Sequence, residues 1–76
     1  MKVRKGQILY YYAAGMDLFD ARTNLNEGDQ VKVITPSGCP PPNHMGHCFV
    51  GDPQTGKFIG LVSTASLQKE KMNAEV

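Results

Sequence analysis

The chain has 76 residues, which is enough for one small domain with a thin hydrophobic core. Eight basic and seven acidic residues leave a net charge of +1, which argues against a dedicated nucleic-acid or membrane binder. No apolar run approaches the roughly 18 residues that a membrane-spanning helix needs, and the basic N-terminus lacks the apolar core of a signal peptide. We therefore expect a cytoplasmic protein whose two cysteines stay reduced.

The first predicted strand carries three consecutive tyrosines. Residues 8–14 are apolar and aromatic, and tyrosine is a good strand former. Side chains alternate between the two faces of a strand, so Tyr10 and Tyr12 are expected on one face and Tyr11 on the other.

Two more strands are predicted, and a loop precedes each of them. Residues 15–29 show no sustained hydrophobic period, which indicates a long first hairpin loop before a strand at residues 30–34. A loop follows at residues 35–43, where the Pro-Pro-Pro run at residues 40–42 favours stiff, extended backbone. We expect this run to cover or rigidify one side of the domain. A third strand is predicted at residues 45–50.

The C-terminal part is predicted to contain a strand, a short helical turn and a last strand. Residues 57–63 form the fourth predicted strand, in which Gly60 indicates close approach of a neighbour to the backbone. One 3₁₀ turn is expected at residues 64–66, where serine and threonine hydroxyls bond the backbone. Leu67 then begins a short fifth strand.

Five short strands with frequent Gly and Pro turns indicate one all-β barrel over residues 1–68, followed by a polar tail at residues 69–76. Three segments in order, residues 8–13 (ILYYYA), 25–34 (LNEGDQVKVI) and 55–62 (TGKFIGLV), carry a family resemblance. They resemble the opening strand, the diverging turn and the distal hairpin of the Src-homology-3 family and its bacterial relatives. The resemblance implies a small five-stranded barrel with a long first hairpin loop, a Pro-rich loop and one 3₁₀ turn.

The chain departs from the peptide-binding members of that family at the ligand platform. Those members stack proline-rich peptides on two tyrosines, a tryptophan and a later proline–tyrosine pair. Tyr10 and Tyr12 match the first two positions, but the chain has no tryptophan, and Ser63 and Ser66 stand at the later pair. Loss of one buried aromatic anchor typically costs about 2 kcal/mol or more, so ordinary proline-motif binding is not expected.

The expected function is a non-catalytic module that binds a protein or peptide, including another copy of itself. A thin core and open strand edges favour pairing between copies. No cofactor is implied, and neither nucleic acid nor a membrane is an expected partner. The predicted contact residues are Tyr10, Tyr12, Asp17, Asp20 and His47.

A cluster of soft ligands, Cys39, His44, His47 and Cys48, suggests a second function. Three of the four could contribute to a tetrahedral zinc site, but adjacent His47 and Cys48 point to opposite faces of a strand. The favoured interpretation places Cys48 in the core, His47 on the surface and Cys39 in a loop. A Cys39–Cys48 disulfide is the remaining alternative.

Two further functions are alternatives for a barrel of this size. Type II dihydrofolate reductases are also short barrels of this class and act as tetramers, but residues 60–63 (Gly-Leu-Val-Ser) replace their Val-Gln-Ile-Tyr run. Nucleic-acid binding is disfavoured by the near-neutral charge. Lys2, Arg4 and Lys5 could contact phosphate, but we expect them to form a solvated tail.

Overall fold

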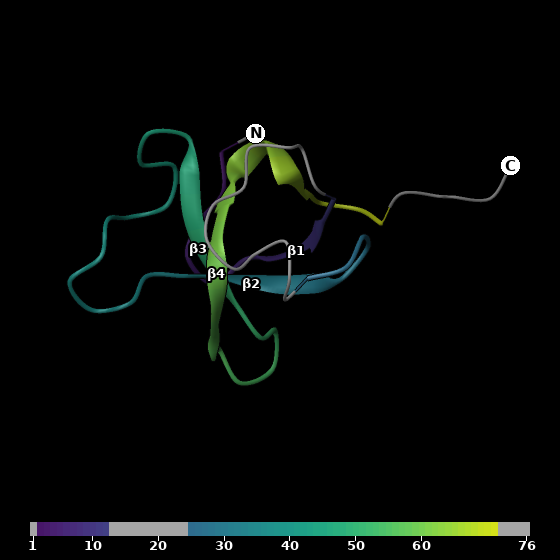
Figure 1. Ribbon diagram of the computed structural model, residues 1–76, viewed down its shortest axis with the longest axis horizontal. Helices are drawn as coiled ribbons and strands as arrows, with labels where there is room; N and C mark the ends of the chain where they lie inside the picture. The colour runs from purple at the N-terminus through teal and green to yellow at the C-terminus, as the bar shows by residue number, and fades with distance from the viewer. Residues whose placement is uncertain (1, 13–24, 72–76) are drawn as a thin grey trace, which may run out of the picture.

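The computed structural model describes residues 2–12 and 25–71, which form one antiparallel sheet (Figure 1). The only helical element of this part of the chain is a single 3₁₀ turn, η1, so the expected all-β fold is confirmed. None of the described helices is long and apolar enough to cross a membrane. The elements are β1 (Ile8–Tyr11), β2 (Gln30–Ile34), β3 (His47–Gly51), β4 (Phe58–Ser63), η1 (Thr64–Ser66) and β5 (Leu67–Gln68).

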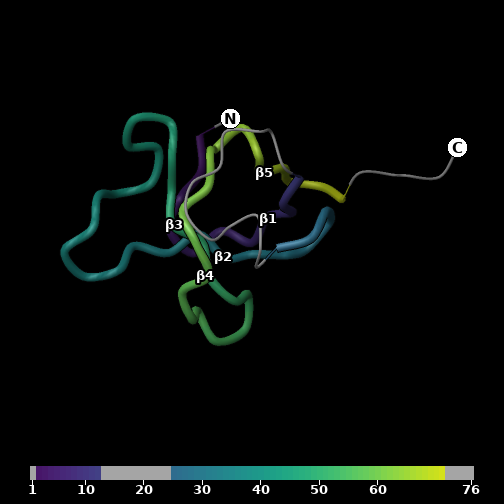
Figure 2. The backbone as a smooth tube through the Cα atoms, viewed as in Figure 1, coloured from purple at the N-terminus to yellow at the C-terminus, as the bar shows by residue number. Residues whose placement is uncertain are grey.

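The strand order is β4-β3-β2-β1-β5, so the last strand returns to the first. β1 to β4 pair with their sequence neighbours, and β5 then pairs with the free side of β1, where Tyr11 lies opposite Leu67. β3 and β4 run across β1 and β2, and β5 lies beside β1 (Figure 2). The sheet therefore curls around its own inner face, which gives the barrel-like shape.

The hydrophobic core lies inside this curl. Strand alternation sends every second side chain inward, as in β2, where Val31 and Val33 are fully buried and Lys32 between them is not. A short chain can fill its interior in this way because all five strands contribute to one core. The buried hydrophobic residues are Val3, Leu9, Tyr11, Leu25, Val31, Val33, Cys48, Val50, Val62 and Leu67.

The third strand begins two residues later than the sequence predicts. Residues 45–50 were expected to be extended, but Asn43 and Met45 have positive φ angles of 70° and 51°. The backbone turns here, and the His47 N–H donates to the carbonyl of His44 at 3.0 Å. The prediction was wrong at this end because hydrophobic alternation does not report left-handed residues.

Gly51 in β3 lies close to another backbone segment. Gly60 of β4, where the sequence predicts close approach of a neighbour, is buried and pairs with Val50. The tightest recorded approach is at Gly51, where an added Cβ would lie 2.6 Å from the carbonyl oxygen of Lys57. The strand pairing shifts by one residue between Val50 and Gly51, and this bulge turns β3 into the following hairpin.

The turn η1 is held by hydroxyl groups, as expected. The Ser63 hydroxyl accepts a hydrogen bond from the Ala65 N–H at 3.2 Å and so caps the turn. The Thr64 hydroxyl donates to the Gly46 carbonyl at 3.2 Å, and the Thr64 N–H donates to the same oxygen at 2.9 Å. These bonds connect the end of β4 to the start of β3.

The N-terminal arm is fixed along the sheet, which corrects the expectation of a solvated tail. Val3 is only 2% exposed, and its backbone is hydrogen-bonded to the side chain of Asn43. The Gly6 N–H donates to the Val33 carbonyl at 2.7 Å, and the Val33 N–H donates to Gln7 at 2.9 Å. The burial of one apolar side chain and these backbone bonds hold the arm in place.

Candidate functional site

The tyrosine triplet splits between the two faces as predicted. Tyr11 is 1% exposed within the core, while Tyr10 and Tyr12 are half-buried on the outer face. The Gln30 side-chain amide donates to the Tyr10 hydroxyl at 3.4 Å. The Tyr12 hydroxyl would lie 3.6 Å from a Cβ added at Gly28, so its ring stands over the turn that leads into β2.

The two loop carboxylates, Asp17 and Asp20, lie outside the described residues. The first hairpin loop was predicted at residues 15–29, and its described end forms a turn at residues 26–29. There the Asn26 N–H donates to the Asp29 carboxylate at 2.9 Å.

His47 lies in an apolar groove of about 190 Å³ between the Pro-rich loop and the outer face of β3 and β4. Phe49 and Leu61 lie opposite each other across the two strands and form its floor, because their neighbours Cys48 and Val62 face the core. The loop forms the opposite wall. The lining residues are Pro40, Pro41, His44, Met45, His47, Phe49 and Leu61.

Met45 is the most unusual residue of this groove. Its side chain is 85% exposed, and its backbone has a positive φ of 51°. A left-handed conformation costs a non-glycine residue roughly 1–2 kcal/mol, so the fold presents this apolar side chain at a cost. The Nδ1 atom of His47 lies 3.1 Å from the Met45 carbonyl oxygen, so a ring protonated at Nδ1 donates to it.

Sequence reasoning identified one residue of this groove as a contact residue and missed most of the others. His47 was predicted, but Met45, Phe49 and Leu61 were not. Strand alternation in β3 and β4 would have placed Phe49 and Leu61 on the outer face. No sequence pattern near them indicates that the Pro-rich loop folds against them. Neither Tyr10 nor Tyr12 lines the groove, so the structure does not join the tyrosines and His47 in this hollow.

The four candidate metal ligands are dispersed. Cys48 is in the core, and burial raises the pKa of its thiol from the ordinary value of 9.0 to about 11. Cys39 lies in the Pro-rich loop, and both cysteines are free thiols. His44 and His47 border the groove. Within residues 2–12 and 25–71, no three His, Cys, Asp or Glu side chains form a group that could hold a metal ion.

No family model matches the chain, and comparison with curated proteins and with solved structures gives no significant match. The inference of function therefore depends on the shape and chemistry of the surface itself.

Proposed function

We propose that this protein is a small non-catalytic module that binds a short apolar segment of a protein in the groove around His47. The exposed Met45 carries this proposal. The protein holds a large apolar side chain 85% exposed, in a strained conformation, beside an apolar hollow. Methionine is flexible and polarizable and therefore suits surfaces that adapt to a bound segment.

The lining chemistry favours binding over catalysis. The groove offers two imidazoles with proline, methionine, phenylalanine and leucine, and its described lining has no carboxylate, hydroxyl or thiol. It therefore lacks a hydroxyl or thiol nucleophile that an imidazole base could activate. A hollow of about 190 Å³ is suited to one or two apolar side chains of a peptide rather than to a whole small-molecule substrate.

A Src-homology-3-like barrel is our proposal for the family. It is supported by the order of the elements: a long connection after β1, a Pro-rich loop between β2 and β3, and a 3₁₀ turn before β5. Under this resemblance His47 or Cys48 stands where the family's tryptophan begins the third strand, and His47 lines the groove. Tyr10, Tyr12, Asp17 and Asp20 are then proposed as a further contact area on the same module.

The partner is a protein or peptide, and a second copy of the chain is one candidate. The run at residues 40–42 is already a stiff, extended proline segment, which could lie in the groove of a neighbouring molecule. Free Cys39 and buried, protonated Cys48 are compatible with the proposed cytoplasmic location.

A peptide-array experiment tests the groove. Immobilised random peptides of about 12 residues are screened with the wild-type protein, and hits are mapped on isotope-labelled protein by NMR chemical-shift changes. We expect the changes to centre on Met45, His47 and Leu61. Leu61→Lys should weaken binding at least tenfold (about 1.4 kcal/mol), because it places a charge on the floor of the groove.

Ile8→Lys is the matched control, because Ile8 is also a partly exposed apolar residue, at 39%, and does not line the groove. It should leave the hits unchanged. Equal loss in both variants, shifts confined to Tyr10 and Tyr12, or an array without hits would contradict the groove as the binding site. Native mass spectrometry at increasing concentration detects binding between copies.

A further inference from the structure

We propose that a second surface of this protein, formed mainly by the fixed N-terminal arm, β2 and the start of β4, binds single-stranded nucleic acid. The first part of this surface is an open hollow of about 520 Å³. It is lined by Lys2, Arg4, Lys5, Gly6, Gln7 and Lys69. Four cationic side chains therefore surround one polar hollow, and no carboxylate lines it.

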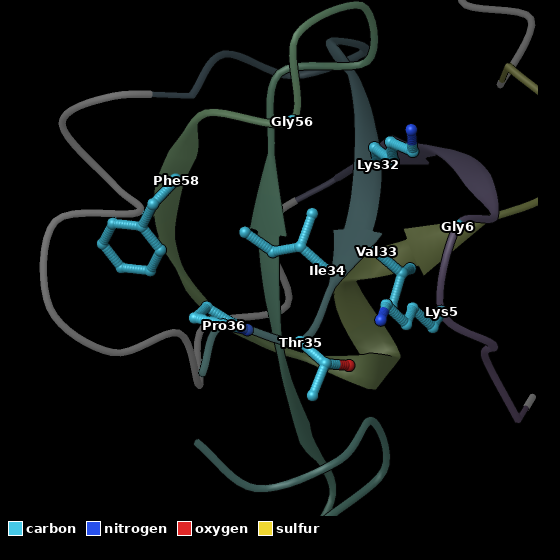
Figure 3. Close-up of a pocket in the computed structure, with 9 residues that line it drawn as sticks. All are labelled: Lys5, Gly6, Lys32, Val33, Ile34, Thr35, Pro36, Gly56 and Phe58. Carbon is cyan, nitrogen blue, oxygen red and sulfur yellow. The ribbon is translucent and has the colours of Figure 1, made fainter. Parts of the chain in front are cut away.

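An adjoining hollow of about 380 Å³ extends the surface (Figure 3). Lys5 and Gly6 line both hollows, so the two adjoin at this part of the arm. The second is also lined by Lys32 and by Phe58, a residue that is 52% exposed. In Figure 3, Lys5 and Lys32 lie on one side of Ile34 and Phe58 lies on the other. A row of cations thus leads to an exposed aromatic ring.

The cations are carried by an ordered backbone. The buried side chain of Val3 anchors the arm, and the Gly6 N–H bonds the sheet at Val33. Between them the Gln7 side chain accepts a hydrogen bond from the Arg4 N–H at 3.0 Å, and Gly6 supplies the positive φ of 88° that the turn requires. A fixed arm loses less conformational entropy on binding than a free tail does.

The aromatic ring favours nucleic acid over an acidic peptide. Proteins that bind single strands combine a basic groove along the phosphates with aromatic rings on which bases stack. Phe58 packs against Phe49 with ring centroids 6.0 Å apart at 49°, which braces the ring while leaving half of it exposed. A purely acidic partner would use the cations and leave this ring unused.

The overall charge of +1 does not reveal that basic residues are concentrated on this surface. Five of the eight basic residues line the two hollows, namely Lys2, Arg4, Lys5, Lys32 and Lys69. Of the described acidic residues, Glu27 and Asp29 belong to the turn before β2, and Asp52 accepts hydrogen bonds from Gln54 and Thr55 within the β3–β4 hairpin. The fourth, Glu70, follows Lys69 but lines neither hollow. Phosphate contacts lose affinity as salt rises, so binding should be strongest at low salt.

Fluorescence anisotropy on the full chain tests the proposal. A fluorescein-labelled oligothymidylate of about 15 nucleotides is titrated with protein between about 20 and 200 mM NaCl. We expect the logarithm of affinity to fall linearly with the logarithm of salt concentration. Lys5→Ala should reduce the slope by about 0.7, the contribution of one phosphate contact to a single strand. Phe58→Ala should weaken binding about fivefold or more at an unchanged slope.

Lys71→Ala is the matched control, because it removes the same charge from a residue that lines neither hollow. Circular dichroism spectra and melting curves verify that each variant is folded. The assignment is overturned by absence of binding at the lowest salt, or by equal effects of Lys5→Ala and Lys71→Ala. It is also overturned if polyglutamate displaces the labelled oligonucleotide as effectively as unlabelled oligonucleotide does, and if Phe58→Ala changes the affinity for neither polymer. The partner would then be an acidic peptide.

Discussion

The side chain of Asn43 hydrogen-bonds both backbone polar groups of Val3, a residue 40 positions away in the sequence. Its Oδ1 accepts from the Val3 N–H at 3.1 Å, and its Nδ2 donates to the Val3 carbonyl at 2.8 Å. The Asn43 amide thus bonds the Val3 N–H and carbonyl as the backbone of a neighbouring strand would. It connects the N-terminal arm to the end of the Pro-rich loop. Val3 lies between Lys2 and Arg4, which line one proposed binding surface, and Asn43 precedes His44, which lines the other.

Replacing Asn43 by glycine separates this contact from backbone strain. Glycine adopts the positive φ of 70° without cost, so Asn43→Gly removes mainly the two hydrogen bonds. We expect the free energy of unfolding in urea to fall by about 1–3 kcal/mol, with faster hydrogen exchange at the Val3 amide. Ser37→Gly, at an exposed position of the same loop, controls for added chain entropy. Equal losses in both variants would contradict the assigned role of Asn43.

Gly51 and Gly46 should tolerate alanine very differently. A Cβ at Gly51 would lie 2.6 Å and 2.8 Å from two backbone oxygens, which cannot move away as a flexible side chain can. We expect Gly51→Ala to lower the unfolding free energy by about 2–3 kcal/mol. Gly46→Ala meets open space and has only its positive φ of 79° to oppose it, so about 1 kcal/mol is expected. Chemical unfolding curves compare the two, and a reversed order would contradict the packing described at the bulge.

The Cys48 thiol should make stability depend on pH in the alkaline range. Its pKa is about 11 in the folded protein and 9.0 ordinarily, so the unfolded chain loses the proton first. The stabilisation is complete below about pH 9 and is lost as the pH rises to about 11, an effect of about 2–3 kcal/mol. Unfolding curves of the wild type and Cys48→Ala should therefore converge over this range, and parallel pH profiles would contradict the assignment.

The prolines at residues 40–42 should stiffen one wall of the groove. Replacing all three by glycine should preserve the melting transition of the sheet, because none of them is in the core. The loop should then exchange its amide protons faster, notably at His44, whose N–H donates to the Pro41 carbonyl at 3.3 Å. Binding of the array-selected peptides should weaken as well. Unchanged exchange rates would show that the proline run does not rigidify the loop.

Elements defined by local patterns were predictable. The strand at residues 30–34 and the turn at residues 64–66 have the predicted boundaries, because alternation and hydroxyl capping act within a few residues. The start of the third strand was mispredicted because the left-handed Met45 belongs to a loop folded against other strands. Phe49 and Leu61 were missed as groove residues because this same loop forms the groove with them. Of the groove residues, His47 was predicted as a contact residue.

The sequence by itself determined which side chains share one face of a strand, since that depends only on the period of the strand. This is why Tyr11 was separated from Tyr10 and Tyr12 before any coordinates. Only the tertiary structure decided which surface residues meet: the basic arm beside Lys32, and the proline loop beside Leu61. Those contacts form only when loops between distant positions close. The entropic cost of closure is offset by many weak contacts, which no short sequence pattern records.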